Sequence, residues 1–282
     1  MSGWPRAVIL ATPMSAPDPK EIALFRDQGF LIVPRFVRGA RLVALQQAAT
    51  RLAQHPKPPL EYEAEVRYPG SPANLAAPGG RTVRRLLQAC SREPVFCAWG
   101  RSATLTTWVA ALLGSVQPQL VQAHHNCLMT KEPRFSSDTG WHQDIRYWNY
   151  EQPDLVNAWL ALTAEHPENG CLRLLAGTHH TELPGDALDE HLFLRPEHPV
   201  FQALIARQHY ARLEPGDVLF FHARSFHAAD RNRSDRVKLS LVFTYKDGEN
   251  RARPGTRSAN LPDLPLPAVP GTGPEKPEDK DA

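Results

Sequence analysis

The pattern of hydrophobic and polar positions divides the chain into an early helical part and a later part built of short segments. Residues 38–54 carry hydrophobic side chains three or four positions apart, which predicts an amphipathic helix. Residues 94–113 repeat this spacing and predict a second helix. Upstream of both, Gly29 closes a short helical stretch, and the apolar run Phe30–Val33 predicts a buried strand.

From residue 119 onward, short hydrophobic segments alternate with turn residues such as Pro215-Gly216, which predicts strands. The predicted strands cover residues 120–130, 155–163, 172–175, 217–222 and 236–245. Helices followed by about eight short strands indicate a mainly β fold with flanking helices. We expect a double-stranded β-helix (jelly-roll or cupin-like) core with the N-terminal helices packed on one sheet. A parallel α/β fold is less favoured, because the late strands lack intervening helices.

The ends of the chain differ in composition from its middle. Residues 1–18 combine prolines with small residues and predict a flexible segment. Residues 251–282 hold seven prolines and end in mixed charges, which predicts a disordered tail. The expected domain therefore covers residues 19–250.

Charge and hydropathy restrict the partners that we expect. The net charge is only +2 and no basic stripe is present, which argues against nucleic acid as the main partner. No apolar run approaches the roughly 18 residues that a membrane helix needs. The start of the chain is too short and too interrupted by proline for a signal peptide. A small molecule is the expected partner.

The four cysteines show no CxxC spacing, and each lies in an apolar neighbourhood. Buried free thiols in a reducing compartment are therefore expected, and the predicted location is cytoplasmic. The cysteines are Cys90, Cys97, Cys127 and Cys171.

A metal site is indicated by His142-Gln143-Asp144 together with His227, which follows an apolar strand. Residues two apart in an extended segment point the same way, so one imidazole and one carboxylate can reach a common ion. Two histidines and one carboxylate are typical of non-haem Fe(II) oxygenases. The short motif is weak by itself, because His166 and Glu168 also fit it.

Another residue competes with His227 for the third ligand position. His222 lies inside the preceding strand, where a packed or hydrogen-bonded histidine is the simpler interpretation.

The strand predicted over 236–245 alternates an apolar face with a face that carries Arg236, Lys238 and Ser240. A polar face is commonly solvated, but in a barrel the second face points into the lumen. Two cations there would attract a carboxylate. The strands near His125 and Trp159 also carry mixed polar and aromatic faces, which favours a shared cavity.

With these features in place, the chain resembles the phytanoyl-CoA dioxygenase family of Fe(II)/2-oxoglutarate-dependent oxygenases over about residues 20–247. The segments that carry the resemblance are GFLIVP, LMTKEP, GWHQDIRYW, PDLVNAWLALT, NGCLRLLAGTH, EPGDVLFFHARSFH and NRSDRVKLS, in this order.

The resemblance implies that His142, Asp144 and His227 are the iron ligands and that Arg236 binds the distal carboxylate of 2-oxoglutarate. It places Trp159 and His125 in the wall of the cosubstrate pocket. Lys131 matches a recurring lysine of the family and is grouped with the cosubstrate-binding residues, without an assigned contact. Two departures from the family pattern concern this pocket: Ala229 replaces a serine of some members, and Lys238 could compete with Arg236.

The implied reaction consumes O2 and 2-oxoglutarate and releases succinate and CO2. Hydroxylation of a C–H bond is the expected outcome. The carboxylate of Asp144 argues against halogenation, which needs that ligand position vacated. Desaturation or ring chemistry stays open.

The substrate is expected to be a small metabolite, either acidic or amphipathic. The tentative contacts are Arg146, Tyr147, Trp148 and Arg173. Two other function classes stay open: a cupin-like metal-dependent hydrolase or isomerase that does not use 2-oxoglutarate, and a non-catalytic jelly-roll binding protein. The oligomeric state is not predicted.

Overall fold

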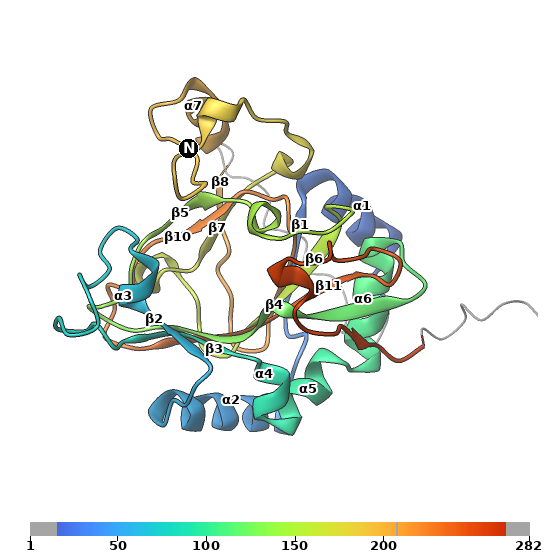
Figure 1. The fold of residues 1–282 in the computed structure, drawn as a ribbon. Helices are drawn as coiled ribbons and strands as arrows, with labels where there is room; N and C mark the ends of the chain where they lie inside the picture. Colours follow the sequence, from blue (N-terminus) through green and yellow to red (C-terminus); the bar gives the residue numbers. More distant parts are fainter. Residues whose placement is uncertain (1–15, 207, 269–282) are drawn as a thin grey trace, which may run out of the picture.

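The computed structural model describes residues 16–206 and 208–268 as two antiparallel sheets, with most of the helices on the side of the larger sheet (Figure 1). The larger sheet has the order β1-β9-β6-β11-β4-β3-β2, and β12 adds to β4. The smaller sheet has the order β5-β10-β7-β8. The strands are β1 Phe30–Val33, β2 Leu60–Tyr62, β3 Val83–Leu87, β4 Pro118–Lys131, β5 Thr139–His142, β6 Leu155–Ala161, β7 Leu172–Leu175, β8 Gln208–Tyr210, β9 Val218–His222, β10 His227–Ala229, β11 Lys238–Asp247 and β12 Leu264–Pro265.

The first helix shows how local sequence sets an element's limits. The Asp18 side chain caps it by accepting hydrogen bonds from the backbone of Lys20 and Glu21, and the Glu21 side chain accepts one from the Asp18 backbone N–H. Gly29 ends it in the left-handed conformation, with φ 79°. The helices are α1 Pro19–Gln28, α2 Gly39–Gln54, α3 Glu63–Val66, α4 Ala89–Arg92, α5 Pro94–Gly100, α6 Ala103–Leu113 and α7 Pro199–Ile205.

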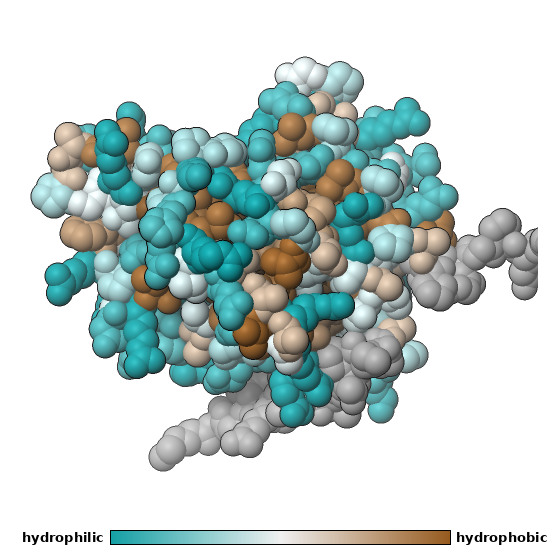
Figure 2. Space-filling model, turned by 90° about the horizontal axis from the view of Figure 1, so that it is seen from below, coloured by the Kyte–Doolittle hydropathy of each residue, from teal (hydrophilic) through white to brown (hydrophobic). Residues whose placement is uncertain are grey.

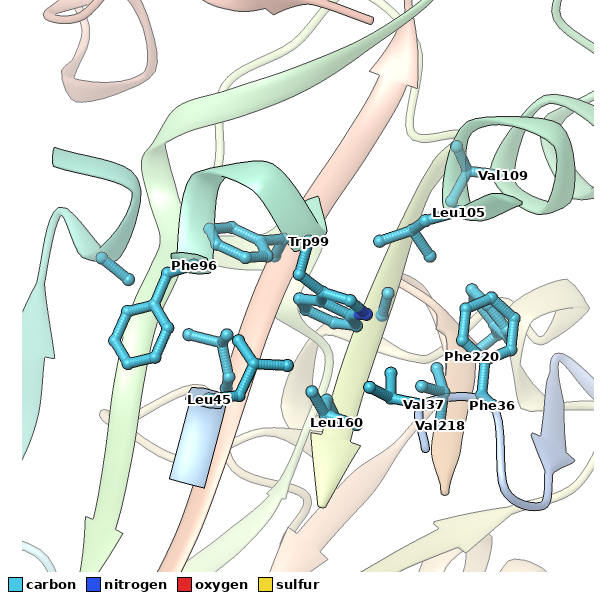
Figure 3. Packing of buried hydrophobic residues seen from close by; sticks show 14 of the residues in the cluster. Phe36, Val37, Leu45, Phe96, Trp99, Leu105, Val109, Leu160, Val218 and Phe220 are labelled. Carbon is cyan, nitrogen blue, oxygen red and sulfur yellow. The ribbon is translucent and has the colours of Figure 1, made fainter. Parts of the chain in front are cut away.

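Helices α2, α5 and α6 cover the outer face of the larger sheet. Leu45, Trp99 and Leu105 reach from them toward Leu160 and Phe220 of the sheet (Figure 3). Burial of each such side chain contributes about 1.5–3 kcal/mol. The opposite side of this helical layer, seen from below in Figure 2, mixes hydrophilic and hydrophobic residues. The predicted double-stranded β-helix with helices on one sheet is confirmed.

Two local predictions were wrong. The single helix expected over 94–113 is interrupted, because Ser102 caps a new helix, α6, by accepting from the Leu105 backbone. Cys90 and Cys97 are not free thiols: α4 and α5 bring their Cα atoms to 4.2 Å and they form a disulfide. Cys127 and Cys171 are free and buried, as expected.

The tail predicted to be disordered from residue 251 packs on the domain as far as residue 268. Its strand β12 pairs with β4 through Leu264 and Leu120. The carboxylate of Asp263 lies 3.2 Å from Lys246 Nζ. Proline is compatible with an edge strand, so the composition did not exclude pairing. Residues 269–282, and residues 1–15 of the predicted flexible start, lie outside the described chain.

Within the described ranges, no helix is both long and apolar enough to span a membrane. The cytoplasmic location stays a prediction.

Candidate metal centre

The three predicted metal ligands lie together at one end of the smaller sheet. His142 ends β5 and His227 begins β10, and the two are register partners in this sheet. Asp144 opens a short 3-10 helix, η1 (Asp144–Tyr147), two residues after His142. One ligand atom from each of the three side chains lies within 4.8 Å of the others. The structure therefore assembles a two-histidine, one-carboxylate site from neighbouring strand ends.

Both imidazoles are oriented by their backbone. Nδ1 of His142 lies 2.8 Å from the Gly140 carbonyl, and Nδ1 of His227 lies 3.1 Å from the Ser225 carbonyl. These contacts assign the proton to Nδ1 and leave Nε2 of each ring to bind a metal. Burial, followed by the charge of His227, lowers the pKa of His142 to about 3. Burial also lowers the pKa of His227. Both rings are therefore neutral at pH 7, as metal binding requires.

Asp144 is held by two neighbours. His125 Nε2 lies 3.2 Å from Oδ1, and Asn157 donates a 2.8 Å hydrogen bond to Oδ2. Burial alone would raise the pKa of Asp144, but the imidazoles of His125 and His227 outweigh it and hold that pKa well below its usual range. Asp144 is thus an oriented, ionised carboxylate. This donor set fits Fe(II), and its outer hydrogen bonds resemble those that position metal ligands elsewhere.

Asn157 was not among the predicted site residues. It is fully buried, and it also accepts a hydrogen bond from the Thr244 hydroxyl. The polar face of the strand predicted over 155–163 was the available signal for it. Buried amides in such a face need partners, so they lie near other buried polar groups.

The two competing histidines lie elsewhere. His166 is the N-cap residue of a short 3-10 helix, Pro167–Asn169. His222 ends β9, and its Nε2 lies 3.3 Å from Asp154. Neither contributes to the three-residue cluster.

A cavity between the two sheets adjoins the metal site. Three of the predicted cosubstrate residues line it, namely His125, Lys131 and Trp159. Its full lining is Glu63, Arg84, His125, Met129, Thr130, Lys131, Thr139, His142, Trp159, Gly170, Leu172, Phe221, His227, Ala228, Ala229 and Lys238.

The fourth predicted cosubstrate residue, Arg236, lies outside this cavity. It is exposed, precedes β11 and does not line the cavity. The reason is the turn before the strand: Asn232 donates hydrogen bonds to the carbonyls of Lys131 and Arg236. The inward face therefore begins at Lys238, which is 4% exposed and lines the cavity.

Lys238 has a buried carboxylate partner that the sequence did not indicate. Its Nζ lies 3.0 Å from Glu165 Oε2 and 5.0 Å from the centre of the Trp159 ring. The other oxygen of Glu165 accepts hydrogen bonds from Trp159 Nε1 and Ser240 Oγ. The carboxylate thus holds the ammonium and the indole in one arrangement.

Lys131 lies opposite Lys238 in the β4–β11 pairing. Its Nζ donates to the Ser137 carbonyl at 3.2 Å. Burial, followed by the charges of Arg84 and Lys238, lowers the pKa of Lys131 to about 7. Gly170 leaves room for this side chain, since a Cβ there would lie 2.7 Å from Lys131 Cε.

Arg84 and Glu63 are two further cavity residues that were not predicted. Glu61 and Tyr62 pair with Arg85 and Val83, so Arg84 is the extra residue of a bulge. Bulges re-aim side chains, and Arg84 points to Glu63, with Nη1 3.5 Å from its Oε2.

The predicted substrate residues surround the site without lining the cavity. Tyr147 is 36% exposed, and its ring centre lies 5.9 Å from that of His142. Trp148 meets His125 edge-on at 5.4 Å. Arg146 donates to Gln143 at 2.7 Å, and Arg173 pairs with Asp230 at 2.7 Å. Their substrate roles stay predictions.

Comparison with known proteins places the chain in a family. A family model described as phytanoyl-CoA dioxygenase (PhyH) matches residues 25–240. The chain belongs to the phytanoyl-CoA dioxygenase family. The ectoine dioxygenase of Halomonas elongata is 25% identical over 256 residues, which cover 85% of this chain and 72% of that protein. Human peroxisomal phytanoyl-CoA dioxygenase is 29% identical over 155 residues, which cover 50% of this chain and 44% of that protein.

Solved structures show the same fold. EctD from S. alaskensis with 2-oxoglutarate and 5-hydroxyectoine has a TM-score of 0.71 at 18% identity, covering 88% of this chain and 83% of that one. The epimerase SnoN in complex with Fe3+, alpha ketoglutarate and nogalamycin RO has a TM-score of 0.68 at 22% identity, covering 91% of both chains. The predicted class, an Fe(II)- and 2-oxoglutarate-dependent dioxygenase, is confirmed, and the hydrolase, isomerase and binding-protein alternatives are set aside.

Proposed function

We propose that this family member hydroxylates a C–H bond of a small metabolite, while 2-oxoglutarate and O2 are converted to succinate and CO2. One observation carries the proposal. The oriented His142–Asp144–His227 site adjoins a cavity that is lined by buried lysines. A metal-dependent hydrolase would need the ligands but not the cations.

The residues divide into two groups by role. His142, Asp144 and His227 would hold Fe(II), which supplies the oxidative chemistry when it is bound. Lys238 and Lys131 would bind the distal carboxylate of 2-oxoglutarate at the far end of the cavity, in place of Arg236. Ammonium groups suit this role because a charge-assisted hydrogen bond is stronger than a neutral one.

The remaining cavity residues would orient the cosubstrate and exclude water. Trp159 lies against Lys238, and Leu172, Phe221 and Ala229 contribute apolar surface. Water exclusion strengthens the interaction between the ammonium groups and a carboxylate. Asp144 occupies the ligand position that a halide would need, which favours hydroxylation.

Anaerobic titration of the protein with Fe(II) and 2-oxoglutarate tests the proposal. A weak visible charge-transfer band should appear only when both are present. His227→Ala should abolish the band, whereas His222→Ala should retain it, because His222 lies outside the metal cluster. A folded, iron-loaded wild-type protein that shows no band with 2-oxoglutarate would disprove the proposed cosubstrate.

The reaction itself needs a second readout. A metabolite screen that measures succinate release, followed by mass spectrometry of the product, should find a gain of one oxygen atom. A product that has lost two hydrogens instead would replace hydroxylation with desaturation.

A further inference from the structure

The charges in the cavity are nearly balanced before any ligand binds. Its lysine and arginine residues are Arg84, Lys131 and Lys238. Arg84 lies 3.5 Å from Glu63, and Lys238 lies 3.0 Å from Glu165. Among the described residues, none places a carboxylate oxygen within 4.0 Å of Lys131 Nζ.

Within the described chain, Lys131 is therefore the cavity cation without a carboxylate partner of its own, and beside Lys238 it would receive the single distal carboxylate of 2-oxoglutarate. An anionic substrate in the same cavity would face Glu63 without a cation of its own. Burying an unpaired charge is costly, so the cavity selects against a substrate with a carboxylate or phosphate near its reacting carbon.

An aromatic collar borders the metal site on its outer side. We define this collar as Tyr68, Tyr147, His191 and Phe193. The Tyr147 and Phe193 ring centres lie 5.9 and 5.7 Å from that of His142. Tyr68 lies 4.9 Å from Phe193, with the rings edge to face.

The collar is held together across three chain segments. The Tyr147 hydroxyl donates to the His191 carbonyl, which ties η1 to the loop before α7. Phe193 packs over Gly140, where a Cβ would lie 2.5 Å from its ring. Arg84, which lines the cavity, lies 5.1 Å from the Tyr68 ring centre and so links the collar to the cavity.

We propose that the aromatic collar binds an uncharged substrate that presents an apolar or aromatic ring to the metal site. The proposal rests on the proposed oxygenase function and names its substrate class. Rings contact rings favourably in edge-to-face and offset geometries. Within the collar, Tyr147 is 36% exposed and supplies an accessible ring, whereas Phe193 is 5% exposed and supports it from behind. The acidic substrate expected from Arg146 and Arg173 is the competing prediction, and Arg173 is already paired with Asp230 at 2.7 Å.

Two matched pairs of probes test the substrate class: indole with indole-3-carboxylate, and 2-naphthol with 2-naphthoate. Each is titrated calorimetrically into anaerobic protein that carries Fe(II) and saturating 2-oxoglutarate. The neutral member of each pair should bind about tenfold more tightly than the acid. Equal or tighter binding of the acids, or no binding of either neutral ring, would overturn the proposal.

Tyr147→Ala tests the collar, because this exposed side chain can be removed without opening the core. It should weaken neutral-probe binding about tenfold and leave the 2-oxoglutarate band unchanged. Phe193→Leu keeps an apolar side chain but removes the ring, and should act in the same direction. Tyr210→Ala is the matched control, since Tyr210 is 41% exposed on β8 and outside the collar.

Unchanged probe binding in both collar variants would disprove the assignment of the collar as the substrate-binding site. Absence of the charge-transfer band from wild-type protein that carries Fe(II) and 2-oxoglutarate would instead contradict the proposed function. Failure of the substrate class and failure of the proposed function are therefore distinguishable.

Discussion

The two faces of β11 are equally buried but chemically unlike. One face carries Leu239, Leu241 and Phe243, which pack with the helices in the outer core. The other carries Lys238, Ser240 and Thr244, and each of these has a buried hydrogen-bond partner. The apolar face stabilises the fold without specific geometry, whereas each polar side chain is held in one position by its partner. The histidines and lysines proposed to bind the metal and the cosubstrate line the cavity to which Lys238 of this polar face belongs.

Among the changes to the two faces of β11, removal of one buried charge should reduce the free energy of unfolding most. Lys238→Met leaves Glu165 buried without its cation, so the free energy of unfolding should fall by about 3–5 kcal/mol. Chemical denaturation measures it. Lys238→Met with Glu165→Gln should recover much of the stability but not the affinity for 2-oxoglutarate.

Arg236→Ala is the control for this prediction. Because Arg236 is exposed and outside the cavity, its removal should change stability by less than about 0.5 kcal/mol and leave 2-oxoglutarate binding unchanged. A large loss of 2-oxoglutarate affinity in this variant would restore the original assignment of Arg236.

A change on the apolar face should separate stability from function. Leu241→Ala creates a cavity in the outer core and should cost about 2–4 kcal/mol of unfolding free energy. The Kd for 2-oxoglutarate of the folded fraction should match that of wild type. A weakened Kd at a temperature where the variant is folded would show that the two faces are coupled.

The affinity for 2-oxoglutarate should depend on the protonation of Lys131. Burial, then Arg84 and Lys238, lower the pKa of Lys131 to about 7, and only its protonated form attracts a carboxylate. Affinity should therefore be highest below pH 7 and fall as the pH rises through 7. Lys131→Met should weaken binding about tenfold at pH 6 and flatten this pH profile. Calorimetric titrations at several pH values measure both effects, and an unchanged profile in the variant would refute them.

The smallest expected effect concerns the C-terminal segment. Ser258→Ala removes the hydroxyl that hydrogen-bonds His124 and the Asn149 backbone. The variant should lose about 1–2 kcal/mol of unfolding free energy relative to wild type. Thermal unfolding of the two proteins checks this, and equal stability would show that this contact of the C-terminal segment does not stabilise the domain.

The sequence determined much of the fold and indicated the residues that are proposed as metal ligands. The spacing of hydrophobic residues predicted α2, β1 and β7 closely, because side-chain burial alone defines such elements. His142 and Asp144 could be identified because they lie two residues apart on one chain segment, and His227 because it ends an apolar strand. Alternation also showed that the strand after His227 has a polar face.

Only the tertiary structure decided which polar residues meet. Alternation gives the face of a side chain but not where the strand begins, so the turn held by Asn232 decided between Arg236 and Lys238. Glu165 and Asn157 gained their roles from partners 73 and 87 residues away, on β11. The Cys90–Cys97 disulfide depends on the approach of two short helices. Such long-range pairings follow from packing rather than local pattern, because a buried polar group must find its partner wherever the fold provides one.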